Sequence, residues 1–406
     1  MKILFVHQNF PGQYLHLARH LGAIPGNEVV FITQRRDATL PGVKNVVYQP
    51  QRSITPDIHH YLRDSEAGIL NAQAVVRLAL DLKESGFTPD VMLGHNGWGE
   101  IWYLKEVFPK TPLIGYFEFF YRFQGADVGF DPSETQIFDT APRIRTKNLG
   151  NLIGLDAADL GQTPTQWQRS LYPEKYQSML HVTHEGIDTQ VVAPDPNCRL
   201  RLQAEGIELT LDDEVLTYVA RNLEPYRGFD SFMRSLPAIL EQRPNAHVLI
   251  VGGDEISYGH RLANGQTHRQ RMLAELGSSL DLKRVHFLGK VPYPMFLNIL
   301  QVSRVHVYLT FPFVLSWSML EAMSAGCLLV ASRTAPVEEV IRDGENGFLV
   351  DFFSPAEISE RVVAALEAGR NSHTDIRQNA RRTIIEKYDL KSICLPAQLS
   401  LLDRVR

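Results

Sequence analysis

Residues 215–240 read VLTYVARNLEPYRGFDSFMRSLPAIL, and this stretch decides the fold. It begins with an apolar run, Val215–Val219, and continues through a polar loop into apolar residues at helical spacing. The helical positions are Phe229, Phe232, Leu236 and Leu240. A short buried strand that leads through a loop into an amphipathic helix is the repeating unit of parallel α/β sheets.

The same alternation extends in both directions from this stretch. Toward the C-terminus the apolar runs are His247–Val251, Val285–Leu288, Val305–Tyr308, Leu328–Ala331 and Gly347–Val350. Toward the N-terminus they are Lys2–Val6, Val29–Ile32, Val46–Tyr48, Val91–Leu93 and Leu113–Tyr116, with a helical face over Ala72–Leu82. A polar, proline-marked stretch, Ala193–Asn197, separates the two series. The sequence therefore predicts two doubly wound α/β domains with parallel sheets.

The composition excludes several other classes of protein. A chain of 406 residues is too long for one ordinary core and suits two domains. With 44% apolar and 21% charged residues it has the composition of a soluble globular protein, and the N-terminal MKILFVHQNF lacks the apolar region of a signal peptide. We therefore expect a cytoplasmic protein.

The cysteines and the net charge exclude further classes of protein. Cys198, Cys327 and Cys394 are scattered, without CxxC spacing, which argues against a disulfide framework and a zinc site. A net charge of −5 gives no general field for nucleic acid, although a local basic patch stays an alternative. No nucleic-acid partner is expected.

Ligands of open parallel sheets bind beyond the carboxyl ends of the strands, where helices begin. After the strand ending near Tyr308, Ser316 and Ser318 stand where a helix is expected to start, with Trp317 between them. The backbone N–H groups there could hold a phosphate, and Glu321 could accept hydrogen bonds from the two hydroxyls of a ribose. The alternative is a surface glutamate on a helix with an N-capping serine.

A second loop joins the strand at Val215–Val219 to the next helix. Arg221 and Arg227 lie in it, and two guanidinium groups at a helix start suit a diphosphate. The alternative is a pair of solvated surface arginines. In the first domain Gly12 occupies the matching loop, where the absence of a side chain would let the backbone approach a ligand.

Several motifs, taken together, resemble a known family. They are VARNLEPYRGF, VLIVGG, VHFLGKVP, HVTHEGIDT, LTFPFVLSWSMLEAMSAGCLLVAS and APVEEVIRDGENGFLV, with FPGQ and WGEIWYLKEVFP as thinner support in the first domain. On these the chain looks like a family 4 retaining glycosyltransferase of GT-B type. The resemblance implies two Rossmann-like domains facing across a cleft. Residues 1–190 with 389–406 would form the acceptor-side domain, and residues 191–388 the donor-binding domain.

The resemblance assigns roles to the residues of the second domain. It implies that Arg221 and Arg227 bind the diphosphate of a nucleotide-sugar, with Arg227 also aiding catalysis, and that Glu321 binds the ribose. The backbone of Ser316–Ser318 would hold the distal phosphate. The base would lie against backbone near Leu288, Gly289 and Lys290.

The sequence departs from the family pattern at two positions. Phe313 stands where the first glutamate of the family's Glu-x7-Glu motif is found, in the part of the donor site near the sugar, so sugar contacts and catalysis are altered there. In the first domain the usual histidine after the strand Leu113–Tyr116 is replaced, with Glu118 nearest. Glu118 or His95 would take over its catalytic role, and the alternative for each is a structural residue.

The resulting expectation is metal-independent hexosyl transfer with retention, from a UDP-sugar such as UDP-glucose. The acceptor would be a carbohydrate, a lipid-linked molecule or a small molecule, and no cofactor is needed. The sequence contains no DxD metal-binding motif. None is expected, because basic side chains at a helix start can neutralise a leaving diphosphate without a metal ion. The alternatives are a donor-binding homologue without transfer activity, a nucleotide-sugar epimerase, and a two-domain solute-binding protein, which would require an export signal.

One segment of the first domain suggests a further partner. Residues 118–147 are rich in aromatic side chains and end with Arg143, Arg145 and Lys147. Such a segment suits an acceptor or a peripheral contact with the inner face of the membrane. The alternative is a loop packed on its own domain.

Overall fold

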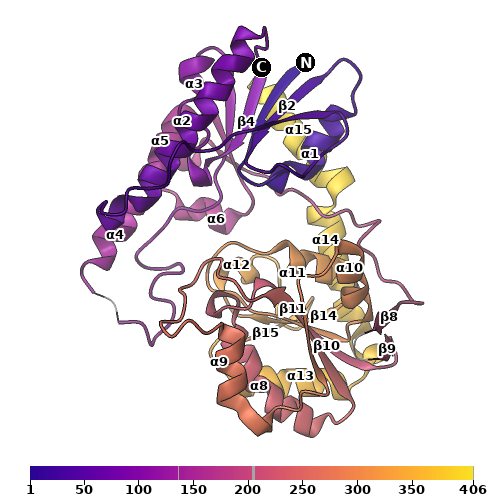
Figure 1. Cartoon of the computed structure of the whole chain (residues 1–406). Coiled ribbons are helices and arrows are strands. Elements are labelled where there is room, and N and C mark those ends of the chain that lie inside the picture. The colour runs from indigo at the N-terminus through magenta and orange to yellow at the C-terminus, as the bar shows by residue number, and fades with distance from the viewer. Residues whose placement is uncertain (136, 204–205, 406) are drawn as a thin grey trace. The chain divides into compact units, whose positions relative to one another are not determined.

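The computed structural model describes residues 1–135, 137–203 and 206–405 and divides into two compact units (Figure 1). The N-terminal unit comprises Met1–Gly186 and Leu390–Arg406, and the C-terminal unit comprises Ile187–Asp389. These bounds differ by a few residues from the predicted 190/191 and 388/389. Gln136, which belongs to the aromatic segment 118–147, lies outside the described residues.

The N-terminal unit is built on a seven-stranded parallel sheet in the order β3-β2-β1-β4-β5-β6-β7. The strands are β1 (Lys2–Val6), β2 (Glu28–Thr33), β3 (Val43–Val47), β4 (Val91–His95), β5 (Leu113–Tyr116), β6 (Leu160–Thr163) and β7 (Leu180–Val182). The helices are α1 (Leu15–Gly22), α2 (Arg63–Glu84), α3 (Leu104–Val107), α4 (Thr140–Lys147), α5 (Leu149–Ala157), α6 (Gln166–Leu171), α7 (Glu174–Gln177) and α15 (Leu395–Arg404).

Side-chain alternation along β1 divides the core of this unit into two layers. Leu4 and Val6 pack in a cluster with the apolar residues of α2, whereas Ile3 and Phe5 pack in a cluster with those of α1 and α15. Because successive side chains of a strand point to opposite faces, one strand serves both layers. The C-terminal helix is therefore part of the N-terminal core.

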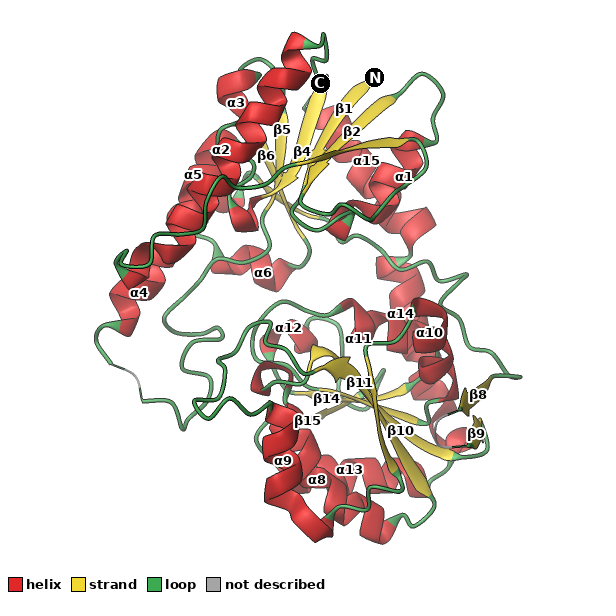
Figure 2. Ribbon diagram, viewed as in Figure 1, coloured by secondary structure: helices red, strands yellow, loops and turns green. Residues whose placement is uncertain are grey.

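The C-terminal unit has a six-stranded parallel sheet in the order β12-β11-β10-β13-β14-β15. The strands are β10 (Glu214–Asn222), β11 (Ala246–Gly253), β12 (Val285–Gly289), β13 (Val305–Tyr308), β14 (Leu328–Ser332) and β15 (Phe348–Val350). The helices are α8 (Phe229–Gln242), α9 (His268–Leu276), α10 (Tyr293–Val302), α11 (Trp317–Ser324), α12 (Ala335–Glu338), α13 (Pro355–Glu367) and α14 (Thr374–Tyr388). As Figure 2 shows, α8 and α13 lie on one face of this sheet and α11 and α14 on the other.

The predicted fold class is confirmed, but some elements were not predicted. They include helices α4 and α5, strands β6 and β7, and an antiparallel hairpin of β8 (Arg199–Leu202) and β9 (Ile207–Thr210). The four strands are short. They have only three or four residues each, and β6 reads LGQT, with two polar residues that are buried in the sheet. Such short strands carry too little periodicity to be recognised from sequence.

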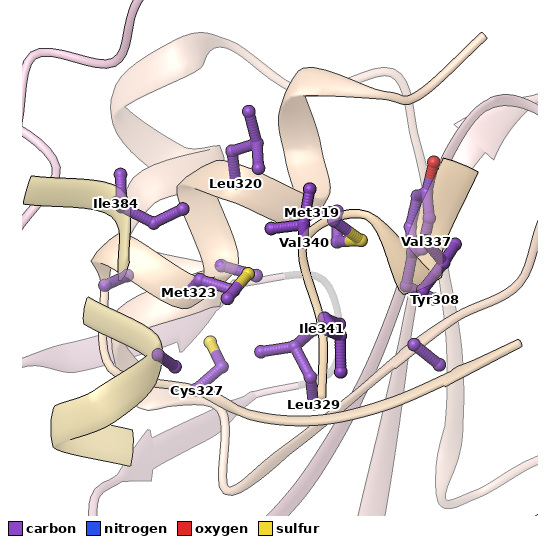
Figure 3. Packing of buried hydrophobic residues seen from close by; sticks show 14 of the residues in the cluster. Tyr308, Met319, Leu320, Met323, Cys327, Leu329, Val337, Val340, Ile341 and Ile384 are labelled. Carbon is purple, nitrogen blue, oxygen red and sulfur yellow. The ribbon is translucent and has the colours of Figure 1, made fainter. Parts of the chain in front are cut away.

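Helix α11 is anchored by its apolar side. Met319, Leu320 and Met323 pack into a buried cluster that also contains Leu329 of β14 and Ile384 of α14 (Figure 3). All five side chains are fully buried. A helix held in this way presents its first turn, at the carboxyl end of β13, in a fixed position.

Candidate active site

Polar side chains gather where the strand order of each sheet reverses. In the N-terminal unit this point lies between β1 and β4, and in the C-terminal unit it lies between β10 and β13. In open parallel sheets, ligands bind beyond the carboxyl ends of the strands at such a point. We call the residues at these two points the N-terminal site (His7, Gly12, Gln13, His95, Glu118) and the C-terminal site (Arg227, Tyr258, Tyr308, Ser316–Ser318, Glu321).

The start of α11 is capped by the protein itself. Ser316 is the N-cap, and its Oγ accepts a hydrogen bond from the N–H of Ser318 at 3.3 Å. The N–H of Ser316 donates to the Tyr308 hydroxyl at 2.9 Å. The predicted helix start is therefore present, and Tyr308, which the sequence reasoning missed, fixes the chain just before it. Trp317 is 41% exposed at this first turn.

Arg227 and Arg221 occupy different environments. The guanidinium of Arg227 is buried, and its Nη1 donates to Thr310 Oγ1 at 2.7 Å, Val314 O at 3.0 Å and the Tyr308 hydroxyl at 3.3 Å. Arg221 is exposed at the end of β10. Since an arginine stays charged in proteins, Arg227 places a fixed positive charge beside the chain that enters α11. Tyr308 and Thr310 tie the loop after β10 to the loop after β13.

A buried carboxylate shapes the loop after β11. Glu224 accepts hydrogen bonds from the backbone N–H groups of Tyr258 at 3.1 Å and Gly259 at 2.8 Å. The Tyr258 ring lies 5.5 Å from the guanidinium carbon of Arg227 and 4.9 Å, between ring centres, from Phe313. Phe313 is itself buried among these aromatic rings. An aromatic cluster therefore occupies the position where the family pattern has a carboxylate.

Glu321 lies one turn into α11 and is partly buried. It accepts a hydrogen bond from the Tyr293 hydroxyl at 2.7 Å, and burial raises the pKa of its carboxyl group. Leu288 and Gly289 end β12, the edge strand on the β11 side of the sheet, and both are partly exposed. Lys290, the next residue, pairs with Glu255.

The N-terminal site brings together residues that follow three strands. His7 follows β1, His95 ends β4, and Glu118 lies two residues after β5. Gln13 joins them, because its side chain contacts both His7, at 2.7 Å, and Glu118, at 3.0 Å. His95 Nε2 lies 3.9 Å from Glu118 Oε2.

Gly12 has a packing reason of its own at this site. Its backbone has φ +53°, and a Cβ atom there would lie 2.5 Å from Nε2 of His7. Any side chain would both strain the backbone and displace the imidazole. The loop therefore needs glycine at this position so that the His7 ring can pack there. This reason is separate from the expected approach of a ligand to the backbone.

Both imidazoles of the N-terminal site are neutral at pH 7. Burial lowers the pKa of His7 to about 4, and burial likewise lowers the pKa of His95 well below its usual range. The His95 ring is stacked between Trp98 and Tyr116, with ring centres 4.6 and 5.1 Å away. The contact between His95 and Glu118 is therefore one of a neutral ring with a carboxyl group.

The sequence reasoning named His95, Glu118, Arg227 and Glu321 as candidate site residues, and the structure places them at the N-terminal and C-terminal sites. It did not name His7, Gln13, Tyr258 and Tyr308. A signal existed for two of these. His7 directly follows β1 and Tyr308 ends β13, so the rule that directs attention to the carboxyl ends of strands applies to both. Tyr258 had no such signal in the sequence. It lies at the site because the buried Glu224 binds the backbone of the loop after β11, which is a tertiary contact.

The described residues contain neither a candidate metal site nor a candidate membrane-spanning helix. No group of three or more His, Cys, Asp or Glu side chains that could hold a metal ion occurs among the described residues. Within the same residues, every helix is too short or too polar to span a bilayer.

Comparisons with solved structures give the class of fold. The chain is similar to Anabaena HepE, solved in complex with UDP and glucose, with a TM-score of 0.68, 15% identity, and coverage of 99% of this chain and 100% of that one. It is also similar to sucrose-phosphate synthase from Thermosynechococcus elongatus, with a TM-score of 0.71, 15% identity, and coverage of 100% and 98%. Together with the two parallel sheets, these similarities define a glycosyltransferase fold of GT-B type.

Family models and curated relatives identify the family. Residues 25–192 match the model described as glycosyl transferase family 4 group, and residues 203–383 match glycosyl transferases group 1. The D-inositol 3-phosphate glycosyltransferase of Acidothermus cellulolyticus is 24% identical over 83% of this chain and 71% of its own length. An uncharacterized glycosyltransferase of Methanocaldococcus jannaschii is 28% identical over 43% of this chain. The chain belongs to the family 4-type GT-B glycosyltransferases.

Some of these alignments are partial. The chain spans 42% of the length of the M. jannaschii relative and 50% of the length of the D-inositol 3-phosphate glycosyltransferase of Corynebacterium glutamicum, which is about half of each. These partial alignments support membership of the family and no particular substrate.

Proposed function

We propose that the protein transfers a hexose from a UDP-sugar, with UDP-glucose as the first candidate, to an acceptor hydroxyl. The observation that carries the proposal is the C-terminal site, where the buried cation Arg227 lies beside the chain that enters α11. Positive charge and helix N–H groups at the end of a parallel sheet suit a nucleoside diphosphate. The solved HepE complexes contain UDP with glucose and UDP-glucose, which supports the choice of donor.

In the proposed donor complex each end of the nucleotide has its own partners. Arg227, the more exposed Arg221 and the first turn of α11, Ser316–Ser318, bind the two phosphates. The carboxylate of Glu321 accepts hydrogen bonds from the ribose hydroxyls, and backbone at Leu288 and Gly289 contacts the base. Tyr258 presents aromatic surface near the sugar, and the buried Phe313 packs against its ring.

The proposed reaction forms one bond and breaks one bond at the anomeric carbon. The acceptor oxygen bonds to this carbon, while the bond from the carbon to the phosphate oxygen breaks and its electron pair leaves with the nucleoside diphosphate. Arg227 and the helix N–H groups stabilise the developing negative charge, and no metal ion is required. Retention of configuration is part of the proposal on family grounds.

On the acceptor side, we assign proton transfer to Glu118. Its carboxylate accepts the proton that the acceptor hydroxyl loses, and His95 lies beside it. Among the relatives, the names D-inositol 3-phosphate glycosyltransferase and phosphatidyl-myo-inositol mannosyltransferase point to polyol acceptors, free or lipid-linked. A carbohydrate, a lipid-linked polyol or a small polyol is accordingly the acceptor class proposed.

The test is a panel of nucleotide-sugars with two readouts, the thermal shift on binding and the release of nucleoside diphosphate. A ligand that binds only the folded state raises Tm by mass action. We expect UDP-glucose to raise Tm and release UDP, and the release to be faster with an inositol phosphate acceptor. If no nucleotide-sugar raises Tm, the proposed donor site is wrong.

Phe313 favours a second candidate function, a donor-binding protein without transfer activity, because it removes a carboxylate from the sugar end. Binding of UDP-glucose without release of UDP under any acceptor would favour this candidate. Free hexose epimers in place of a glycoside would instead indicate an epimerase. Phe313→Glu is the informative variant, since it restores the family pattern and should raise the rate of UDP release if the missing carboxylate limits it.

We also propose that the protein acts in the cytoplasm, with residues 118–147 making peripheral contact with the inner face of the membrane. Phe138 in this segment is 90% exposed, and the nearby Arg143 and Arg145 are exposed as well. Exposed aromatic and basic side chains together suit anionic lipid head groups. Sedimentation with phosphatidylglycerol vesicles should fall in Phe138→Ser, and equal sedimentation of both proteins would contradict the contact.

A further inference from the structure

The N-terminal site contains a hydrogen-bond chain that runs from His7 through Gln13 to Glu118. His7 Nε2 lies 2.7 Å from Gln13 Oε1, and Gln13 Nε2 lies 3.0 Å from Glu118 Oε1. His7 comes directly after β1, Gln13 lies in the short 3₁₀ helix Gly12–Tyr14, and Glu118 follows β5. The chain thus links residues that are up to 111 positions apart (118 − 7) in the sequence.

The backbone fixes the direction of this chain. The N–H of Asn9 donates to His7 Nδ1 at 2.9 Å, so Nδ1 is an acceptor and the proton of the neutral imidazole lies on Nε2. Nε2–H then donates to Gln13 Oε1, which leaves the Gln13 amide nitrogen as the donor to Glu118. The carboxyl oxygen at the end of the chain can only accept.

The other carboxyl oxygen of Glu118 faces a second donor. The N–H of Gly97 donates to His95 Nδ1 at 3.0 Å, so the proton of His95 also lies on Nε2. This buried Nε2 has no hydrogen-bond partner among the described residues, and it lies 3.9 Å from Glu118 Oε2. A modest movement of the carboxylate would bring the two atoms within hydrogen-bond distance.

We infer that His7 and Gln13 are positioning residues, which hold Glu118 as a hydrogen-bond acceptor with one oxygen fixed and the other directed at His95. The amide donor on Oε1, with the N–H of His95 3.9 Å from Oε2, favours the ionised carboxylate, the form that can take a proton. This inference deepens the proposed function and rests on it for the role of Glu118 in proton transfer.

The surroundings of the chain keep it in this arrangement. Gln168 Nε2 donates to the backbone carbonyl of Glu118 at 2.6 Å, so the backbone is held as well as the side chain. Gly12 leaves space for the His7 ring. The titratable groups near Glu118 include His95, Tyr116 and Tyr172, and burial keeps all three neutral by lowering the pKa of the histidine and raising those of the tyrosines.

The first test compares three variants for UDP release from UDP-glucose, with water as the acceptor. Gln13→Met keeps the volume of the side chain but removes its amide. Gln13→Glu keeps an acceptor for His7 but replaces the amide donor with a carboxylate oxygen. The control, Gln73→Met, replaces glutamine by methionine at an exposed position of α2. We expect Gln13→Met to lower kcat on the order of 10²-fold, because small misplacements of a catalytic group cost this much. KM for UDP-glucose should stay unchanged, since Gln13 lies outside the C-terminal site.

The pH dependence of kcat separates positioning from simple loss of structure. In Gln13→Glu the acid limb of the profile should move to higher pH, because a second carboxylate beside Glu118 disfavours its ionised form. Gln73→Met should match the wild type in kcat, KM and pH profile. If Gln13→Met and Gln13→Glu also match the wild type, the inference is wrong.

A second test does not depend on activity. Nitrogen-15 NMR of the labelled imidazoles, assigned with His7→Asn and His95→Asn, should show both rings neutral at pH 7 with the proton on Nε2. A proton on Nδ1 of His7 would overturn the inference even in an active enzyme. If the wild type releases no UDP while the predicted tautomers are found, the proposed function fails and the hydrogen-bond chain stands.

Discussion

At the scale of the residue, Arg227 stabilises the fold and, in the proposed function, also binds the donor diphosphate. Arg227→Ala would leave buried acceptors at Thr310 and Val314 without their donor, and each such loss costs about 1–3 kcal/mol. We therefore expect the free energy of unfolding to fall by about 3 kcal/mol and the UDP-induced rise in Tm to disappear. Urea denaturation and thermal shift with UDP measure the two effects.

Arg221 supplies the matched control for this variant. It lies in the same loop but is exposed, so Arg221→Ala should change the free energy of unfolding by less than about 0.5 kcal/mol. Its effect on UDP affinity should be smaller than that of Arg227→Ala. Equal loss of UDP binding in both variants would show that the exposed arginine carries as much of the diphosphate contact as the buried one.

Glu100 predicts an unusual pH dependence of stability. Its side chain is fully buried, the Tyr48 hydroxyl donates to it at 2.7 Å, and burial raises the pKa of its carboxyl group from 4.5 to about 7. The folded state therefore binds a proton that the unfolded state releases between these values, and stability falls as the pH rises through this window. Between pH 5 and pH 8 the loss should be about 2–3 kcal/mol, at 1.36 kcal/mol per pKa unit.

Glu100→Gln isolates this contribution, because the amide keeps the shape of the side chain but does not titrate. Urea denaturation at pH 5 and pH 8 should show the additional loss in the wild type and not in the variant. The same pH dependence in both proteins would mean that Glu100 ionises in the folded state at its ordinary pKa.

At the scale of the element, one substitution can separate the observed cap of α11 from the phosphate binding proposed for its first turn. Ser316→Asp keeps an N-capping oxygen for the N–H of Ser318 and adds a negative charge that the helix dipole favours. The free energy of unfolding should therefore stay within about 0.5 kcal/mol of the wild type, as expected for a preserved cap. UDP affinity should fall at least about tenfold, since the carboxylate repels the diphosphate.

Ser316→Ala is the companion variant, and calorimetric titration with UDP measures the affinities. Loss of the cap should cost about 1 kcal/mol of stability, with a smaller effect on UDP affinity than that of Ser316→Asp. If Ser316→Asp binds UDP as tightly as the wild type, the phosphates do not lie at this helix start.

Several elements that show a clear period were predictable from the sequence. The strand and helix of residues 215–240 form β10 and α8, and the expected start of α11 after Tyr308 is present. The short strands β6 and β7 and the hairpin of β8 and β9 were not predictable. Their few residues are recruited by pairing with neighbouring strands, which is a tertiary effect that no local pattern records.

At the scale of the whole molecule, the N-terminal unit depends on the last residues of the chain. Leu401 and Leu402 of α15 are buried in the same core as Phe5 and Leu17. Deletion of residues 390–406 should expose this core layer and destabilise the N-terminal unit alone. Hydrogen exchange should show loss of amide protection in β1 and α1, with protection in β10 and α11 retained.

The control is the 406-residue chain with the substitution Asp403→Asn. This variant changes α15 but keeps the apolar contacts of the helix. It should keep protection in both units. Loss of protection in β10 as strong as that in β1 after the deletion would contradict the expectation that α15 stabilises the N-terminal unit alone.

The sequence alone determined the class of fold. The periods of strands and helices, and the loops that follow strands, depend only on neighbouring residues and can be read directly from the sequence. It also pointed to Arg227, Glu321, His95 and Glu118 through motifs and strand ends. The tertiary structure alone decided that Arg227 is buried and Arg221 exposed, that Phe313 packs among aromatic rings, and that His7 reaches Glu118 through Gln13. These are contacts between loops that follow different strands, and their geometry is fixed only when the sheet brings the strand ends together.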